Sequence, residues 1–404
     1  MSSPSPRPLP SAATALLLLL SAAPYQVFGQ TKTWTPPVTS EVGWAQVDTL
    51  GSGPAPGLYR AISAVQLGSG LIAVVNQGSN DLGLYERGGR LVRTIGSEGD
   101  GPGEFQRIGQ VAAWQPDTLV VFDRSHQRLT VLGEDGTVHW TSTYQMTSTR
   151  RLGGIVRLSG GRWISWTDET VLPVGPGEMR RDSMTFQVAN VDRVVTLGET
   201  VAVTPGLISA ALVIQGRVGV RDAAFSPTTV STAIGRCLAI MATDDPTIRL
   251  LNSSGDRVGE IALPSRERTA SATDLETWID GLMTSASQGP EELLPAIRRA
   301  LSDAPRPTTL PHFNSMFAAD DGTIWVQRWA PPLGEGHEWW VVDPSLETIQ
   351  RVTTKDPARG LGTTAGGDLI ATVSDQRGVE SLRILSRPPA IGGSTSRPLA
   401  ADCG

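Results

Sequence analysis

Short apolar segments, each ending at a polar residue, recur along most of the chain and constrain its fold more than any other feature. The six segments are LIAVVN, TLVVFD, WISWTD, LAIMATD, TIWVQR and LIATVSD, and they end at Asn76, Asp123, Asp168, Asp244, Arg328 and Asp375. Successive ends lie 47, 45, 76, 84 and 47 residues apart. Three of these intervals nearly agree, and each of the other two contains an insertion. Self-similarity at such a period is typical of a repeat architecture.

Each segment belongs to a set of four short β-like stretches. In the second unit, IGQVAAWQ precedes TLVVFD, LTVL follows it after a turn, and a glycine turn introduces the fourth stretch. Four strands with turn glycines at fixed offsets are the pattern of a β-propeller blade. We predict an all-β fold over residues 41–387, a six-bladed β-propeller with four-stranded antiparallel blades. Residues 44–50 are predicted to add the outer strand of the sixth blade.

The segment GDGPGEF, together with IGQVAAWQPDTLVVFDRSHQRLTVLGEDGTV after it, resembles an NHL repeat. The matching positions are a glycine–phenylalanine lead, a core pair and a DG turn: Gly101, Gly103, Phe105, Asp123, Arg128, Asp135 and Gly136. The resemblance covers residues 96–140 and part of the other units. It implies the propeller architecture. NHL-like propellers include ligand and protein scaffolds, lactonase-like hydrolases and an amidating lyase.

The glycine-rich stretch GSEGDGPGEF, residues 96–105, lies between two repeat units. It lacks the lysine and the serine or threonine of a P-loop, and its glycines do not match a dinucleotide fingerprint. Its acids, Glu98, Asp100 and Glu104, lack the spacing of an EF-hand. We interpret it as the crossover from the outer strand of one blade to the inner strand of the next, with Phe105 packed between the blades.

The first 29 residues have the features of a secretory signal peptide. Arg7 precedes an apolar run from Ala12 to Ala23, and Val27 and Gly29 suit cleavage after Gly29. The run is shorter than the roughly 20 residues that a membrane-spanning helix needs. We therefore predict export to the periplasm or the extracellular space, and no membrane span. Residues 388–404 are predicted to form a disordered tail.

Charge and cysteine content narrow the classes of partner and site. A formal net charge of −6 and an isoelectric point near 5.4 argue against nucleic acid as the main partner. The two cysteines, Cys237 and Cys403, form no CxxC pair, which leaves a zinc site of that kind without support. Exported proteins form disulfides, so a Cys237–Cys403 bridge and two free thiols both stay open.

Two segments depart from the repeat. Residues 169–183 lengthen a loop of the third unit and are predicted to be exposed. Residues 264–309 form a predicted helical insertion. Its first helix, DLETWIDGLMTSA, is capped by Ser271 or Thr273, and Pro295 is expected to kink or shorten its second, EELLPAIRRALSD. The insertion would cover the channel mouth, offer a partner surface, or pack its apolar stripe on the nearest blade.

Polar residues that end the repeated segments are the candidate metal ligands. The resemblance to lactonase-like propellers implies calcium in the central channel, and the candidates are Asn76, Asp123, Asp168, Asp244 and Asp375. The same residues stand at turn starts, where Asn and Asp side chains accept hydrogen bonds from nearby backbone N–H groups. We favour this structural interpretation. Asp123 and Arg128 are expected to form an ion pair that braces the turn.

Aromatic and basic residues of the fifth unit are the candidate ligand surface. Its members are His312, Arg328, Trp329 and His337. The four histidines of the chain are not placed to converge on one metal ion, and no GxSxG, HExxH or Walker A sequence occurs. The leading hypothesis is an exported propeller that binds a small-molecule or protein ligand without a cofactor. The alternative is a calcium-dependent lactonase- or esterase-like hydrolase, so enzymatic activity stays open.

Overall fold

β-Strands make up most of the described chain, with two α-helices in one insertion. The computed structural model describes residues 32–43, 48–49, 58–147, 150–169, 174–286, 291–331, 337–345, 347–354, 358–374 and 380–389. Among these residues, neither α-helix combines the length and the apolar run that a bilayer crossing requires. The described residues belong to one compact unit. The predicted signal peptide and most of the predicted tail lie outside the described residues.

The first two units are antiparallel sheets in which each strand pairs with the next. The first contains β4 (Ala61–Gln66), β5 (Ile72–Asn76), β6 (Asp81–Tyr85) and β7 (Leu91–Ile95). The second contains β10 (Ile108–Gln115), β11 (Thr118–Asp123), β12 (Arg128–Gly133) and β13 (Val138–Tyr144). Strands β5 and β11 are buried at every position, as expected for short apolar runs bounded by turns.

The third and fourth units repeat this pairing and extend it. The third contains β14 (Arg150–Arg157), β15 (Trp163–Glu169), β16 (Met179–Val191) and β17 (Val194–Ile214), and β18 (Arg217–Asp222) pairs with the far end of β17. The fourth contains β19 (Thr229–Ile234), β20 (Cys237–Ala242), β21 (Thr247–Leu251) and β22 (Arg257–Ala262). A two-residue parallel pairing of β13 with β17 joins the second and third units into one sheet.

The last two units complete the series. The fifth contains β23 (Phe313–Ala318), β24 (Ile324–Arg328), β25 (His337–Asp343) and β26 (Thr348–Thr354). The sixth contains β27 (Ala358–Thr363), β28 (Leu369–Ser374) and β29 (Glu380–Leu385). Its fourth strand is β3 (Asp48–Thr49), which pairs with β29 within the predicted stretch 44–50.

Two further strands precede β3 and were not predicted. Strand β1 (Lys32–Trp34) pairs in parallel with β22, and β2 (Val38–Gly43) pairs in parallel with β26. Strand pairing therefore begins before residue 41, the predicted start of the domain. The N-terminal segment covers the outer edges of the fourth, fifth and sixth units in turn, which protects strand edges that would otherwise pair with other chains.

The first strands of the six units, which we call the inner strands, contact one another in cyclic order. β4 contacts β10, β10 contacts β14, β14 contacts β19, β19 contacts β23, β23 contacts β27, and β27 contacts β4. Hydrophobic clusters of described residues follow the same order, each shared by neighbouring units. In the cluster of the sixth and first units, Ile370 and Leu382 pack with Ile72. We call the side on which the inner strands begin the upper face.

The glycine-rich stretch crosses from the first unit to the second, as predicted. Its ends form the short parallel strands β8 (Ser97–Glu98) and β9 (Glu104–Phe105). Phe105 is fully buried in the hydrophobic cluster that the two units share. A Cβ atom at Gly96 would lie 2.7 Å from the Phe105 ring, and the φ angle of Gly96 is +84°. Glycine is therefore required where the chain turns over the ring.

The predicted helical insertion contains α1 (Ala272–Ala286), the short 3-10 helix η1 (Glu291–Leu293) and α2 (Leu294–Asp303). Ser271 caps α1: its Oγ accepts a hydrogen bond from the Asp274 N–H, and the Asp274 carboxylate accepts one from the Ser271 N–H. Pro295 lies in the first turn of α2, so it shortens the predicted second helix without kinking it. A single bridge between Thr269 and Thr309 closes the base of the insertion.

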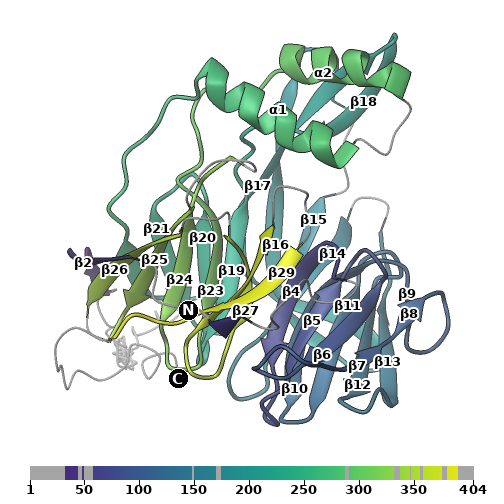
Figure 1. Ribbon diagram of the computed structural model, residues 1–404, viewed down its shortest axis with the longest axis vertical. Helices are drawn as coiled ribbons and strands as arrows, with labels where there is room; N and C mark the ends of the chain where they lie inside the picture. Colours follow the sequence, from purple (N-terminus) through teal and green to yellow (C-terminus); the bar gives the residue numbers. More distant parts are fainter. Residues whose placement is uncertain are drawn as a thin grey trace, which may run out of the picture. The chain divides into compact units, whose positions relative to one another are not determined.

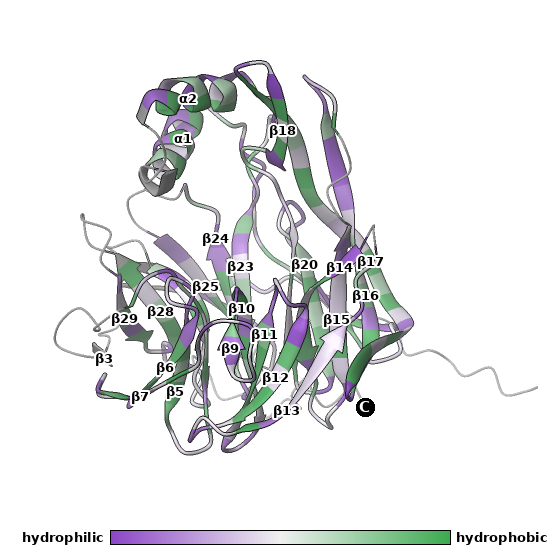
Figure 2. Cartoon of the chain, turned by 90° about the vertical axis from the view of Figure 1, so that its right-hand side faces the viewer, coloured by the Kyte–Doolittle hydropathy of each residue, from purple (hydrophilic) through white to green (hydrophobic). Residues whose placement is uncertain are grey.

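The insertion packs on a part of the third unit that was not predicted, residues 179–183 and 205–225, which we call the extension. Leu212 and Phe225 form one apolar cluster with Leu275, Ile279 and Leu301 of the helices. Figure 1 shows α1 and α2 above the sheets beside β17 and β18, and Figure 2 shows β17 rising toward β18 and the helices from another side. The prediction that residues 169–183 form only an exposed loop is wrong for its last part. Residues 179–183 belong to β16 and pair with β17.

Replacing Phe105 by alanine tests how much the crossover contributes to stability. We expect Phe105→Ala to lower the free energy of unfolding by about 3–5 kcal/mol, because it leaves a cavity in the cluster shared by the first two units. Urea unfolding measures the change. The control is Val92→Ala on β7, where the side chain is 42% exposed, and its expected effect is within about 0.5 kcal/mol. Equal effects of the two substitutions would show that Phe105 does not hold the units together.

Candidate functional site

Three of the four predicted ligand-surface residues lie together on the upper face. His312 immediately precedes β23, and Arg328 ends β24. The backbone N–H of Trp329 donates to the carbonyl oxygen of His312 at 3.0 Å. Ser265, just after β22, completes the group: its Oγ lies 2.7 Å from His312 Nδ1 and accepts a hydrogen bond from Arg328 Nη1 at 2.8 Å. We call Ser265, His312, Arg328 and Trp329 the His312 cluster.

Aromatic rings hold the guanidinium of Arg328 in place. Its central carbon lies 5.2 Å from the centre of the Trp340 ring and 5.7 Å from that of Phe313. Both distances are within cation–π range. Burial lowers the pKa of Arg328, and the nearby Glu338 carboxylate opposes this shift. The Arg328 side chain is therefore a partly desolvated cation with a fixed orientation.

Trp329 connects the cluster to the helical insertion. Its ring contacts Phe225 edge to face at 5.7 Å between centres, and Arg268 lies over it at 5.6 Å. Trp329 also packs against the apolar cluster of β17, α1 and α2. Ser265 and Arg268 were not predicted as site residues, because they belong to a segment whose position depends on how the insertion joins the sheets.

The surroundings of His312 favour the uncharged form of its imidazole. Burial lowers its pKa, Arg328 lowers it further, and the acids Asp244, Glu267 and Asp245 oppose the shift. A neutral imidazole beside a serine hydroxyl can accept a proton from that hydroxyl or orient it. Among the described residues no carboxylate is hydrogen-bonded to the His312 ring, so a serine–histidine–acid triad is not assembled there. The geometry of the cluster suits recognition of a polar ligand.

His337 does not join the cluster. It is the first residue of β25, 7% exposed, and its Nδ1 lies 3.0 Å from the carbonyl oxygen of Ala358 in the sixth unit. Burial lowers the pKa of His337, and the hydrogen bond with Ala358 opposes that shift. The structure therefore places His337 between the fifth and sixth units, apart from Arg328 and Trp329.

The described metal-ligand candidates are engaged by other partners. The Asn76 side-chain oxygen accepts a hydrogen bond from the Tyr59 backbone, and the Asp244 carboxylate pairs with both terminal nitrogens of Arg181. The Oδ2 atom of Asp168 lies 3.7 Å from Nη2 of Arg124. Asp375 falls outside the described residues. No group of three or more His, Cys, Asp or Glu side chains within the described ranges is arranged to hold a metal ion. The calcium ligand set that the resemblance to lactonase-like propellers implied, as the alternative to a structural role, is not formed by the described candidates.

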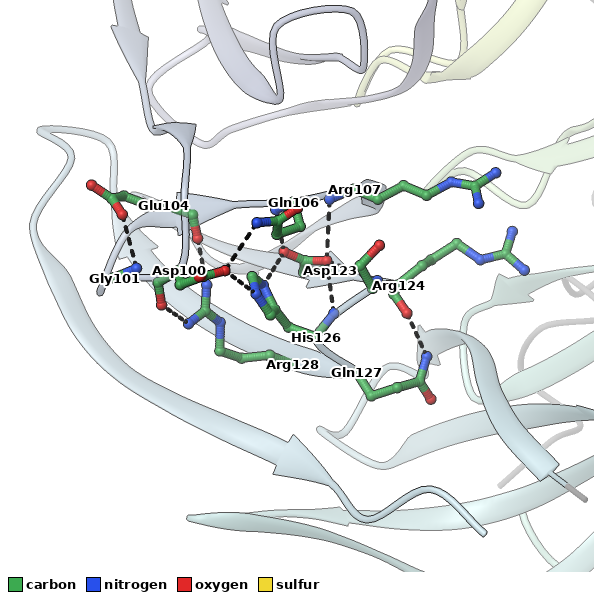
Figure 3. A network of polar contacts seen from close by, with 11 residues as sticks. Asp100, Gly101, Glu104, Gln106, Arg107, Asp123, Arg124, His126, Gln127 and Arg128 are labelled. Atoms are coloured by element: carbon green, nitrogen blue, oxygen red, sulfur yellow. Dashed lines mark hydrogen bonds and ion pairs between the residues drawn. The ribbon is translucent and has the colours of Figure 1, made fainter. Parts of the chain in front are cut away.

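Asp123 is the centre of a local hydrogen-bond network rather than a partner of Arg128. Its fully buried carboxylate accepts hydrogen bonds from four backbone N–H groups, those of Gln106, Arg107, Ser125 and His126. His126 lies between two acids, with Nδ1 2.8 Å from Asp123 and Nε2 2.8 Å from Asp100 (Figure 3). This network ties the glycine-rich crossover to the turn after β11.

Arg128 points to the crossover backbone. Its guanidinium donates to the carbonyl oxygens of Asp100 and Glu104 (Figure 3). The predicted Asp123–Arg128 ion pair is therefore replaced by separate interactions. Asp123 accepts from backbone N–H groups that converge on its two oxygens, and Arg128 donates to backbone carbonyl groups of the crossover.

Comparisons with known proteins give distant structural likenesses. No family model matches the chain, and no curated protein matches it. A putative exported protein from Bacteroides fragilis is 11% identical, covering 87% of this chain and 98% of that chain, at a TM-score of 0.49. Virginiamycin B lyase from Staphylococcus aureus is 10% identical, and the alignment covers 85% of this chain and 99% of that chain at a TM-score of 0.43.

A calcium-binding protein, regucalcin, from Agrobacterium tumefaciens is 10% identical, covering 87% of this chain and 98% of that chain, at a TM-score of 0.40. The chain therefore spans most of the length of each of these proteins. Because the identities and TM-scores are this low, the ligands and residue roles of these proteins are not assigned to this chain.

The Asp123 network predicts a loss of stability in acid. Hydrogen bonds from Gln106 and His126 outweigh burial and hold the pKa of Asp123 below its ordinary value of 3.8. As pH falls, the unfolded chain therefore takes up this proton before the folded chain does. The stabilising contribution of the Asp123 carboxylate to the free energy of unfolding is fully present above pH 3.8, the ordinary pKa. It is lost as the pH falls through the lower pKa of Asp123 in the folded protein.

Urea unfolding between pH 7 and pH 3 tests this assignment. We expect Asp123→Asn to lower the free energy of unfolding by about 1–3 kcal/mol at pH 7, because the amide leaves buried donors unsatisfied. We also expect the variant to lose less stability than the wild type between pH 7 and pH 3. Parallel stability curves for the two proteins would contradict the assignment.

Proposed function

We propose that the chain is an exported six-bladed β-propeller that acts as a ligand-binding module on its upper face. The six units are its blades, and β3 and β29 close the ring. The cyclic contacts of the inner strands and the clusters shared by neighbouring units support this architecture. The resemblance of residues 96–140 to an NHL repeat points to the same arrangement.

Export follows in this proposal from the signal peptide at residues 1–29, with cleavage after Gly29. Cys237 supports it, because this buried residue of β20 is disulfide-bonded. Disulfides persist in oxidising compartments such as the periplasm and the extracellular space. The other cysteine of the chain, Cys403, lies outside the described residues.

The His312 cluster is the observation that carries the binding function. Arg328 is oriented by Ser265 and by two aromatic rings, and Trp329 lies beside it under Arg268. Fixed guanidinium groups bind carboxylates through paired hydrogen bonds, and a tryptophan face adds apolar contact. The ligand class that suits this surface is a small aromatic molecule or a peptide side chain that carries an anionic group.

Indole-3-acetate tests the binding proposal, since it combines an aromatic ring with a carboxylate. We expect saturable binding to the full chain by calorimetry, weakened about tenfold or more in Arg328→Gln, because a charge-assisted hydrogen bond is lost. His312→Gln is expected to weaken binding less, because it alters only the orientation of Ser265. Melting curves establish that each variant is folded.

The matched control is Arg193→Gln, which removes an exposed arginine at the turn between β16 and β17. We expect it to bind indole-3-acetate with the wild-type affinity. The proposal is overturned by the absence of saturable binding to the wild type, or by equal affinities of the wild type and Arg328→Gln.

Peptide mapping without reduction tests the compartment. We predict a peptide containing Cys237 linked to one containing Cys403 in protein prepared from an oxidising compartment, since the chain has no third cysteine. Reduction is expected to release the two peptides. Recovery of both cysteines as free thiols in the exported protein would falsify this pairing.

A further inference from the structure

Three arginines gather where the second and third units meet on the upper face. Arg107 immediately precedes β10, and its carbonyl oxygen accepts a hydrogen bond from the backbone N–H of Arg124, which follows β11. Arg151, on β14, is the strand partner of Asp168, on β15. Figure 3 shows the side chains of Arg107 and Arg124 extending in the same direction, away from the Asp123 network.

Two glycines of the inner strands make room for this group. A Cβ atom at Gly109 would lie 2.5 Å from Cγ of Arg124, and one at Gly153 would lie 2.7 Å from Oδ2 of Asp168. Both glycines are the unpaired residues of β-bulges, in β10 and in β14. Bulges at such positions re-aim neighbouring side chains. The Arg124 stem and the Asp168 carboxylate therefore lie directly over the inner strands.

The positive charge of the group is only partly neutralised. Arg124 lies 3.7 Å from Asp168, its nearest acid, and the second acid nearby is Asp222 at the end of β18. Within the described part of the chain, no hydrogen bond or ion pair reaches the guanidinium of Arg107 or Arg151. Three cations thus face two acids in a protein whose formal net charge is −6.

Electrostatic effects on the titrating groups agree with this geometry. Burial lowers the pKa of Arg124, Asp168 opposes the shift, and Arg151 and Arg107 add to it. Burial also raises the pKa of Asp168, so this carboxylate is poorly solvated. An incoming anion would meet the partly buried guanidinium of Arg124 and the exposed guanidinium groups of Arg107 and Arg151, which carry the same charge. A negative ligand would reduce the repulsion among these three groups.

We propose that Arg107, Arg124 and Arg151 form an anion-binding site for the carboxylate or phosphate group of a small ligand. Guanidinium groups match both oxyanions through paired hydrogen bonds. Asp222, on the extension that carries the helices, limits how tightly an anion is held. The site is independent of the His312 cluster, because it uses residues of the second and third units instead of the fourth and fifth.

Calorimetric titration of the full chain at low ionic strength tests the proposal, with inorganic phosphate and citrate as separate probes. We expect saturable binding of at least one of them, weakened about tenfold in Arg124→Gln and in Arg151→Gln, and strengthened severalfold in Asp222→Asn. Binding of phosphate alone identifies a phosphate site, and binding of citrate alone identifies a carboxylate site. Arg151 is exposed, so its substitution leaves the fold intact.

One control separates this site from other positive charge. Arg193→Gln, which removes an exposed arginine at the turn between β16 and β17, is expected to bind the anion with wild-type affinity. The inference is overturned if neither anion binds saturably to the wild type. It is also overturned if the double variant Arg124→Gln, Arg151→Gln binds as tightly as the wild type.

Discussion

Packing of the last unit on the first is the constraint on which the rest of the structure depends. Ile370, Leu382 and Ile384 of the sixth unit share a hydrophobic cluster with Ile72 and Val74 of the first. Each inner strand is consequently held between two neighbours, and none is left at an open edge of the cycle. The N-terminal strands β1, β2 and β3 extend this protection to the outer edges of the last three units.

The helical insertion and the extension of the third unit depend on each other in the same way. Helix α1 buries Leu275 and Ile279, but only because Leu212 and Phe225 of the extension lie against them. Neither part could cover its apolar residues alone. A helix this short gains most of its stability from packing of its apolar face. The pair forms a second core, which projects from the upper face (Figures 1 and 2).

The repeated strands could be predicted because their signals are local. A run such as TLVVFD, bounded by turn residues, indicates its strand, and Ser271 is one of the two residues predicted to cap α1. The extension was missed because β16 and β17 pair over a longer stretch than their local pattern indicates. Strands β1 and β2 were missed because their partners lie more than 200 residues away in the sequence.

The candidate site was predictable only in part for a related reason. Arg328 ends a repeated strand and Trp329 follows it, so their position on the upper face could be predicted from the repeat period. Ser265 and Arg268 reach the same place through the insertion, and no spacing rule fixes such a return. The ion pair predicted between Asp123 and Arg128 does not form, because backbone N–H groups around the turn donate to the Asp123 carboxylate instead.

One repeated backbone hydrogen bond accounts for the location of both proposed sites. The residue after the second strand donates its N–H to the carbonyl oxygen of the residue before the inner strand. This bond joins Gln77 to Arg60, Arg124 to Arg107, Thr243 to Thr228, and Trp329 to His312. Because the backbone supplies the bond, the side chains at these positions are not needed for pairing. The fold thus presents variable side chains at equivalent places on one face, and arginine, histidine and tryptophan there are available for binding.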